Sequence, residues 1–121
     1  MSYLNDLKTL QAIKSQESER LVELTTISDG YTVLSSSNNK TLLFDDSSSG
    51  YITLPDYSED SIPVGFTLDV VQIGSGKAVF EPSGSSTIKS LNSAVETSGE
   101  GAMVNVIKIS TNGWLISGDI Q

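Results

Sequence analysis

The sequence contains no cysteine and no histidine, and these two absences exclude several kinds of site. Disulfide bonds, metal sites built from thiolates or imidazoles, and Ser-His or Cys-His catalytic pairs all need one of these residues. No stretch approaches the roughly 18 to 20 apolar residues that a membrane helix requires. Residues 1–14 show no basic leader followed by an unbroken apolar core, so we also expect no secretory signal.

Positive charge is scarce as well. The chain has 7 Lys and Arg residues against 15 Asp and Glu residues, which gives a net charge of -8 at pH 7. Such a chain is repelled by phosphate backbones and by anionic lipids, so we expect neither nucleic acid nor a membrane as a partner. Its 121 residues suit one domain, and a hydrophobic content of 37% predicts a modest core that burial against other copies would strengthen.

An apolar stripe marks the N-terminal region. Leu4, Leu7, Leu10 and Ile13 recur at every third position, which predicts a helical arm over residues 1–19. A helix of this length is marginal alone in water, so it must pack against something. The stripe fits oligomerisation or docking to a partner, and the alternative is that it covers an open end of its own domain.

From residue 20 onward, short apolar runs alternate with turn residues. The runs lie at 21–27, 31–34, 41–44, 51–54, 66–73, 78–80, 87–88, 94–95, 103–109 and 114–118. Many short strands without interleaved helices predict a mainly β domain over residues 20–121, an antiparallel β-sandwich or small barrel. Gly74-Ser75-Gly76 is expected to close one hairpin, and Asn112-Gly113 is expected to form a type I′ turn in another.

Three glycine-rich or acidic segments are candidate ligand sites. Gly74-Ser75-Gly76-Lys77 lacks the earlier glycine, the following Ser or Thr and the helix of a phosphate-binding loop, so it is interpreted as a turn. Asp45-Asp46 and the acidic residues of 56–60 lack EF-hand spacing, and solvated loops explain them better than bound Ca²⁺. We therefore expect no metal and no cofactor.

The remaining candidates are contact residues. Trp114 follows a turn and is expected in the core or in a subunit interface, where a large apolar ring is buried. The segment with Asp56, Tyr57, Glu59 and Asp60 is expected to be an exposed contact loop. Paired carboxylates could serve glycoside hydrolysis, but aromatic residues make up only 7% of the chain and suggest no sugar cleft, so the prediction is that the protein is not an enzyme.

Four segments occur in an order that resembles β-domains of bacteriophage virion proteins. They are YITLP at 51–55, IPVGF at 62–66, VQIGSG at 71–76 and VNVIKISTNGWLISGD at 104–119. The resemblance covers roughly residues 20–120. It implies a virion structural protein of the capsid decoration, cement or head-fibre type, or a module of a tail fibre, commonly in a homotrimer.

The expected function is therefore a trimeric capsid decoration protein that binds and braces the outside of the major capsid shell. Its partners would be other copies of itself and the major capsid protein or another virion protein. A tail fibre would continue into a shaft or a carbohydrate-binding domain, and the short chain favours the capsid exterior. The alternative is a receptor-recognition module that contacts the host surface through the loops at 45–50 and 56–61.

Overall fold

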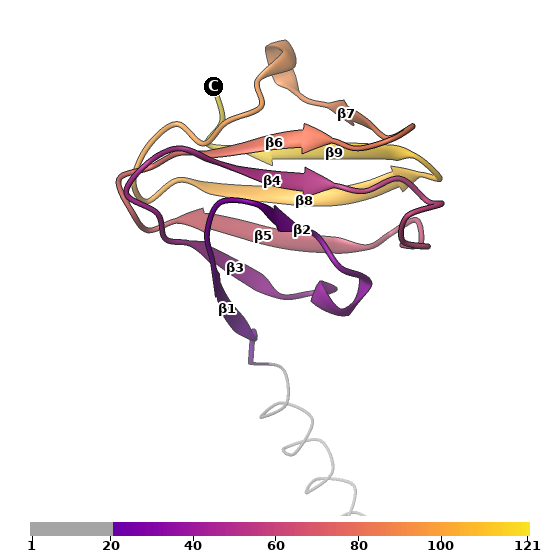
Figure 1. Cartoon of the computed structure of the whole chain (residues 1–121), viewed down its shortest axis with the longest axis horizontal. Helices are drawn as coiled ribbons and strands as arrows, with labels where there is room; N and C mark the ends of the chain where they lie inside the picture. Colours follow the sequence, from indigo (N-terminus) through magenta and orange to yellow (C-terminus); the bar gives the residue numbers. More distant parts are fainter. Residues whose placement is uncertain (1–20) are drawn as a thin grey trace, which may run out of the picture.

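The computed structural model describes residues 21–121, so the predicted helical arm with Leu4, Leu7, Leu10 and Ile13 lies outside the described residues. The described chain forms two facing β-sheets (Figure 1), and the prediction of a mainly β domain is confirmed. The strands are β1 (Leu24–Ile27), β2 (Tyr31–Thr32), β3 (Thr41–Phe44), β4 (Gly50–Leu54), β5 (Thr67–Gln72), β6 (Ala78–Pro82), β7 (Thr87–Lys89), β8 (Met103–Ser110) and β9 (Gly113–Gly118). Two 3₁₀ turns, η1 (Ser35–Ser37) and η2 (Leu91–Ser93), connect them.

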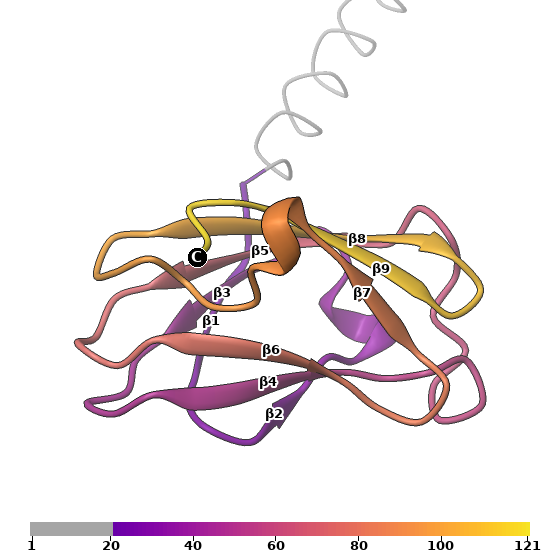
Figure 2. The same ribbon diagram turned by 90° about the horizontal axis from the view of Figure 1, so that it is seen from above.

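The first six strands alternate between the two sheets. One sheet has six strands in the order β1-β3-β5-β8-β9-β7, and the other has three in the order β2-β4-β6. Seen from above, the two layers lie one over the other (Figure 2). The chain therefore makes three coils, β1–β2, β3–β4 and β5–β6. Each coil adds one strand to each layer, as in a short β-solenoid.

The expectation of an antiparallel sandwich is wrong for most of the sheet pairings. β1 pairs parallel with β3 and β3 with β5, while β2 pairs parallel with β4 and β4 with β6. β7 also lies parallel to β9, and antiparallel pairing joins β5 to β8 and β8 to β9. Parallel neighbours need a crossover connection between them, and among the first six strands the strand in the opposite sheet provides it.

The two expected hairpins have different outcomes. The link at Gly74–Gly76 does not close a hairpin, because β5 and β6 lie in different sheets. The link before Trp114 does close one, since β8 and β9 pair antiparallel with Ser110 opposite Gly113. Neither Asn112 nor Gly113 has a positive φ, so the turn is not of type I′.

The core lies between the two sheets. Alternate residues of each strand point inward, as the period of two requires. Leu42 and Phe44 of β3 are fully buried, and so are Val104 and Val106 of β8. The intervening residues of the six-stranded sheet point to its outer face.

Side chains join successive coils at the corner where the chain leaves the six-stranded sheet. The backbone N–H of Asp29 donates to Oδ2 of Asp46 at 3.2 Å, and the N–H of Tyr51 donates to Oδ1 of Asp29 at 2.8 Å. The N–H groups of Ser48 and Asp29 stabilise the charged carboxylate and lower the pKa of Asp46. The carboxylates of Asp29 and Asp46 thus accept hydrogen bonds from backbone N–H groups that have no partner in a neighbouring strand.

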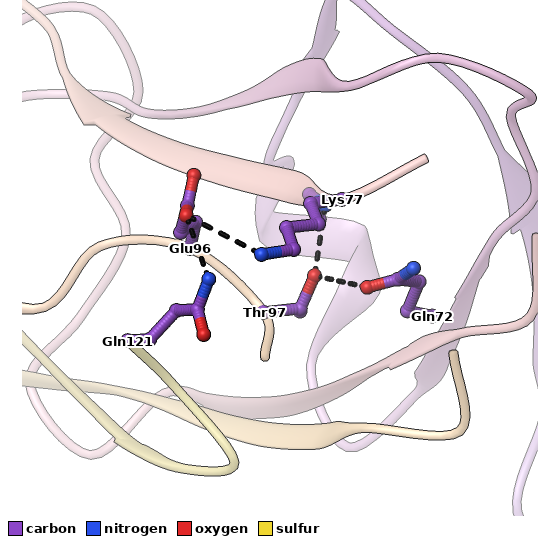
Figure 3. Close-up of polar contacts among 6 residues, drawn as sticks. Gln72, Lys77, Glu96, Thr97 and Gln121 are labelled. Atoms are coloured by element: carbon purple, nitrogen blue, oxygen red, sulfur yellow. Dashed lines mark hydrogen bonds and ion pairs between the residues drawn. The ribbon is translucent and has the colours of Figure 1, made fainter. Parts of the chain in front are cut away.

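A buried polar cluster closes the last coil (Figure 3). Thr97 is fully buried, and its Oγ1 accepts a hydrogen bond from the N–H of Ala78 at 2.9 Å and donates one to Oε1 of Gln72 at 2.5 Å. At the surface, Nζ of Lys77 lies 3.7 Å from Glu96, and Gln121 donates to the same carboxylate at 3.1 Å. These contacts fasten the segment before β8 and the C-terminus to the third coil.

Candidate functional site

The predicted contact loop follows β4 and leads toward β5. Tyr57 is 45% exposed and Glu59 is exposed, as expected for a contact surface. Asp56 corrects the expectation, because it is only 6% exposed and its carboxylate serves the loop itself. Asp60 is partly buried.

The Asp56 carboxylate organises the loop through three hydrogen bonds. Oδ2 accepts from the N–H of Ser85 at 2.8 Å, while Oδ1 accepts from Oγ of Ser58 at 2.7 Å and from the N–H of Glu59 at 3.0 Å. These donors, with Ser85 the strongest, favour the ionised form and lower the pKa of Asp56 from 3.8 to about 2. The loop is therefore held in one shape by its own aspartate.

Lys108 lies beneath this loop and was not among the residues that the sequence singled out. It occupies an inward position on β8, in phase with Val104 and Val106, and it is 1% exposed. Its Nζ has no hydrogen-bond partner among the described residues. Burial lowers the pKa of the Lys108 ammonium, and the nearby charges of Asp56 and Asp60 oppose that shift.

Two aromatic rings surround the ammonium instead of acceptors. Nζ of Lys108 lies 4.7 Å from the centre of the Trp114 ring and 5.9 Å from that of Tyr57. Both distances fall within the range of a cation–π interaction. The negative faces of the rings therefore compensate part of the cost of burying the charge.

Trp114 is a core residue and not a surface residue. It is fully buried within its own chain, which places it in the core, the first of the two expected locations. Its Nε1 donates to the carbonyl oxygen of Pro55 at 3.0 Å, and Phe66 packs edge-on against it at 5.8 Å between ring centres. The tryptophan thereby ties β9 to the start of the contact loop.

The structure brings Asp56, Tyr57, Asp60 and Trp114 together around Lys108. The backbone of the loop is also fastened to the β8–β9 hairpin, because the N–H of Tyr57 donates to Oδ1 of Asn112 at 2.8 Å. The arrangement fastens the loop through hydrogen bonds at both Asp56 and Tyr57 and presents Tyr57 and Glu59 to solvent. The repeated alternation at residues 104, 106 and 108 is the sequence signal that places the lysine inside.

A second candidate surface is the outer face of the six-stranded sheet. The register aligns Thr26, Leu43, Val71 and Met103 in one row across four strands. A second row contains Ile107 and Leu115, which face each other on β8 and β9. Met103 is 51% exposed and Ile109 is 45% exposed, so aliphatic side chains on this face remain open to solvent.

The centre of this outer face is polar but nearly uncharged. Asn105 donates from Nδ2 to Oδ1 of Asp69 at 2.9 Å and to Oγ1 of Thr67 at 3.0 Å. Among the described residues, the outward positions of the sheet carry one carboxylate, Asp69, and one ammonium, Lys89 on the edge strand β7. The face is therefore aliphatic and amide- or hydroxyl-bearing, in a protein whose net charge is -8.

No group of three or more acidic side chains within residues 21–121 is arranged to hold a metal ion. None of the helices in that range is long and apolar enough to cross a membrane. A comparison with models of protein families finds no match, and a comparison with curated proteins finds no significant one.

Proposed function

We propose that this chain is a structural protein of a bacteriophage virion, a homotrimeric decoration protein that binds and braces the outside of the major capsid shell. The observation that carries the proposal is the nearly uncharged outer face of the six-stranded sheet. A face with half-exposed Met103 and Ile109 suits a role in binding and assembly. Such a role needs no catalytic chemistry.

The resemblance to virion β-domains supports the same role, and its four segments have definite places in the fold. The segment 51–55 contains most of β4, and 62–66 leads into β5. The segment 71–76 includes the end of β5 and the following corner, and 104–119 contains the β8–β9 hairpin. The segments therefore belong to one continuous two-layered domain.

A decoration protein would stabilise a shell by burying surface across neighbouring subunits. A specific contact typically buries about 1,200–2,000 Å² in total. Repetition over many copies makes a modest affinity at each contact sufficient. Residues 1–19, with Leu4, Leu7, Leu10 and Ile13, would join the copies or reach the shell.

The second candidate is a receptor-recognition module of a tail fibre. The observation that favours it is the hydrogen-bonded loop of residues 56–60, which presents Tyr57 at 45% exposure beside the exposed Glu59. An exposed tyrosine offers a ring face to a sugar and a hydroxyl to a polar partner. In this candidate, Tyr57→Ala would reduce binding to host cells.

Immunogold labelling of intact virions separates the two candidates. Label spread over the head is the result expected for a decoration protein. Label confined to the tail would reject the decoration role and support the receptor-recognition module. Virions that carry no label, although the antibody recognises the purified chain, would contradict both.

A further inference from the structure

From the outer face of the six-stranded sheet we infer that this surface is the contact between copies of the chain, in which each copy packs the face against the others. The inference deepens the proposed function, because it names the surface that holds the assembly together. It starts from the side chains that the register places on the outside. These are Leu24, Thr26, Thr41, Leu43, Thr67, Asp69, Val71, Met103, Asn105, Ile107, Ile109, Leu115 and Ser117.

The charge distribution identifies another copy as the occupant. Each copy carries a net charge of -8, so two copies repel one another wherever their acidic loops approach. On the outer face, the single carboxylate of Asp69 already accepts a hydrogen bond from Asn105. Two such faces therefore bring together only one carboxylate each, that of Asp69, whereas a basic partner would be drawn to the acidic loops around Asp46 and Asp56.

The chemistry of the face disfavours other ligands. Its outward residues include no aromatic ring for stacking on a sugar or a base, and its one ammonium, Lys89, lies on the edge strand. Aliphatic side chains such as Val71 and Ile107 gain free energy when they leave water, in proportion to the area buried. Thr67 and Asn105 bond within their own face and do not require a polar partner from the other copy.

The size of the face approaches that of one side of a standard interface. Five neighbouring strands of the sheet, β1, β3, β5, β8 and β9, span about 24 Å at a spacing of about 4.8 Å per strand. Four outward residues of β8, from Met103 to Ile109, span about 20 Å along the strand. The resulting flat area of about 500 Å², enlarged by the relief of the side chains, approaches the roughly 800 Å² that each partner contributes to a standard interface.

Sedimentation velocity of the full chain over a range of concentrations tests the inference. Met103→Glu and Ile109→Glu each place a carboxylate on the face, and each is expected to raise the dissociation constant of the oligomer at least about tenfold. Tyr51→Glu is the matched control, because Tyr51 is 50% exposed and lies on a strand of the other sheet. Circular dichroism and thermal melting verify that each variant remains folded.

Three results would overturn the inference. One is a full chain that stays monomeric at every concentration tested. Another is an oligomer that Met103→Glu and Ile109→Glu leave as stable as Tyr51→Glu does. The third is an oligomer that persists in both face variants but is lost in Leu7→Glu, because residues 1–20 alone would then hold the copies together. Labelling of virions is independent of all three, so failure of this contact is distinguishable from failure of the proposed function.

Discussion

Lys108 and Trp114 face each other across β8 and β9, with Nζ of the lysine 4.7 Å from the centre of the indole ring. Both side chains are buried, at 1% and 0% exposure. The Lys108 ammonium has no hydrogen-bond acceptor among the described residues, so the negative face of the Trp114 ring compensates part of the cost of burying its charge. This pair connects the hairpin to the acidic loop above it.

Lys108→Met is expected to stabilise the protein at pH 7 by about 1 kcal/mol. The substitution removes a buried donor whose missing bond costs about 1–3 kcal/mol, and it gives up a cation–π interaction of about 0.5–2 kcal/mol. Burial keeps the pKa of Lys108 in the folded protein below its usual 10.5. At pH values between the folded-state pKa and 10.5, the unfolded chain therefore binds more protons than the folded protein does. The wild-type protein therefore gains stability as the pH rises through that window, and the advantage of methionine shrinks.

Urea unfolding of both proteins at pH 7 and pH 10 measures this difference. Lys89→Met is the control, because Lys89 is exposed on an edge strand and its loss should change the free energy of unfolding by no more than about 0.5 kcal/mol. A Lys108→Met protein that is less stable than wild type at pH 7 would show that the ammonium has an acceptor in solution.

Asp56→Asn is expected to weaken the protein at neutral pH and to flatten its stability between pH 4 and pH 2. The amide nitrogen cannot accept the hydrogen bond that the N–H of Ser85 donates to Oδ2. The folded-state pKa of Asp56 is about 2 against 3.8 in the unfolded chain, so its contribution is present above about pH 4 and is lost as the pH falls through 2.

Acid unfolding followed by circular dichroism provides the measurement for Asp56. Asp45→Asn is the matched control, since Asp45 is an exposed aspartate in the loop after β3. Parallel acid-unfolding curves for the Asp56→Asn and wild-type proteins would contradict the role assigned to this carboxylate.

Thr97→Val is expected to destabilise the protein by about 2 kcal/mol or more. Valine keeps the shape of threonine but leaves the N–H of Ala78 and Oε1 of Gln72 without their buried partner. Thr97→Ser keeps the hydroxyl and loses one methyl group, so it should cost only about 1 kcal/mol. Equal losses for the two variants, measured by urea unfolding, would mean that the methyl group and not the hydroxyl matters.

Gly76→Ala is expected to cost about 2 kcal/mol or more, because the corner turns of the second and third coils are in direct contact. A Cβ at position 76 would overlap the carbonyl oxygen of Ser48, and the N–H of Gly76 already donates to the carbonyl oxygen of Asp46. Gly99→Ala is the control, since a Cβ there meets nothing within 4 Å and should change stability by no more than about 0.5 kcal/mol. Similar melting temperatures for the two variants would refute this packing of the turns.

Local pattern was enough to locate most of the strands and part of the site. The run at 41–44 coincides with β3, and the run at 66–73 contains β5, because alternating burial and β-branched residues act over a few neighbours. The same reasoning selected Tyr57 as exposed, from its polar surroundings in the loop. It failed at Asp56, whose burial depends on donors from Ser85, distant in sequence.

The pairing of the strands was decided only in three dimensions. Short links such as 74–76 are typical of hairpins, yet the chain uses them to cross between sheets, so that β3 pairs with β1 and β5 and not with β4. Composition determined that this is an acidic, mainly β chain without thiol or imidazole chemistry. Tertiary packing decided that Lys108 is buried under the loop and that the outer sheet face is nearly free of charge, because both depend on which distant segments meet.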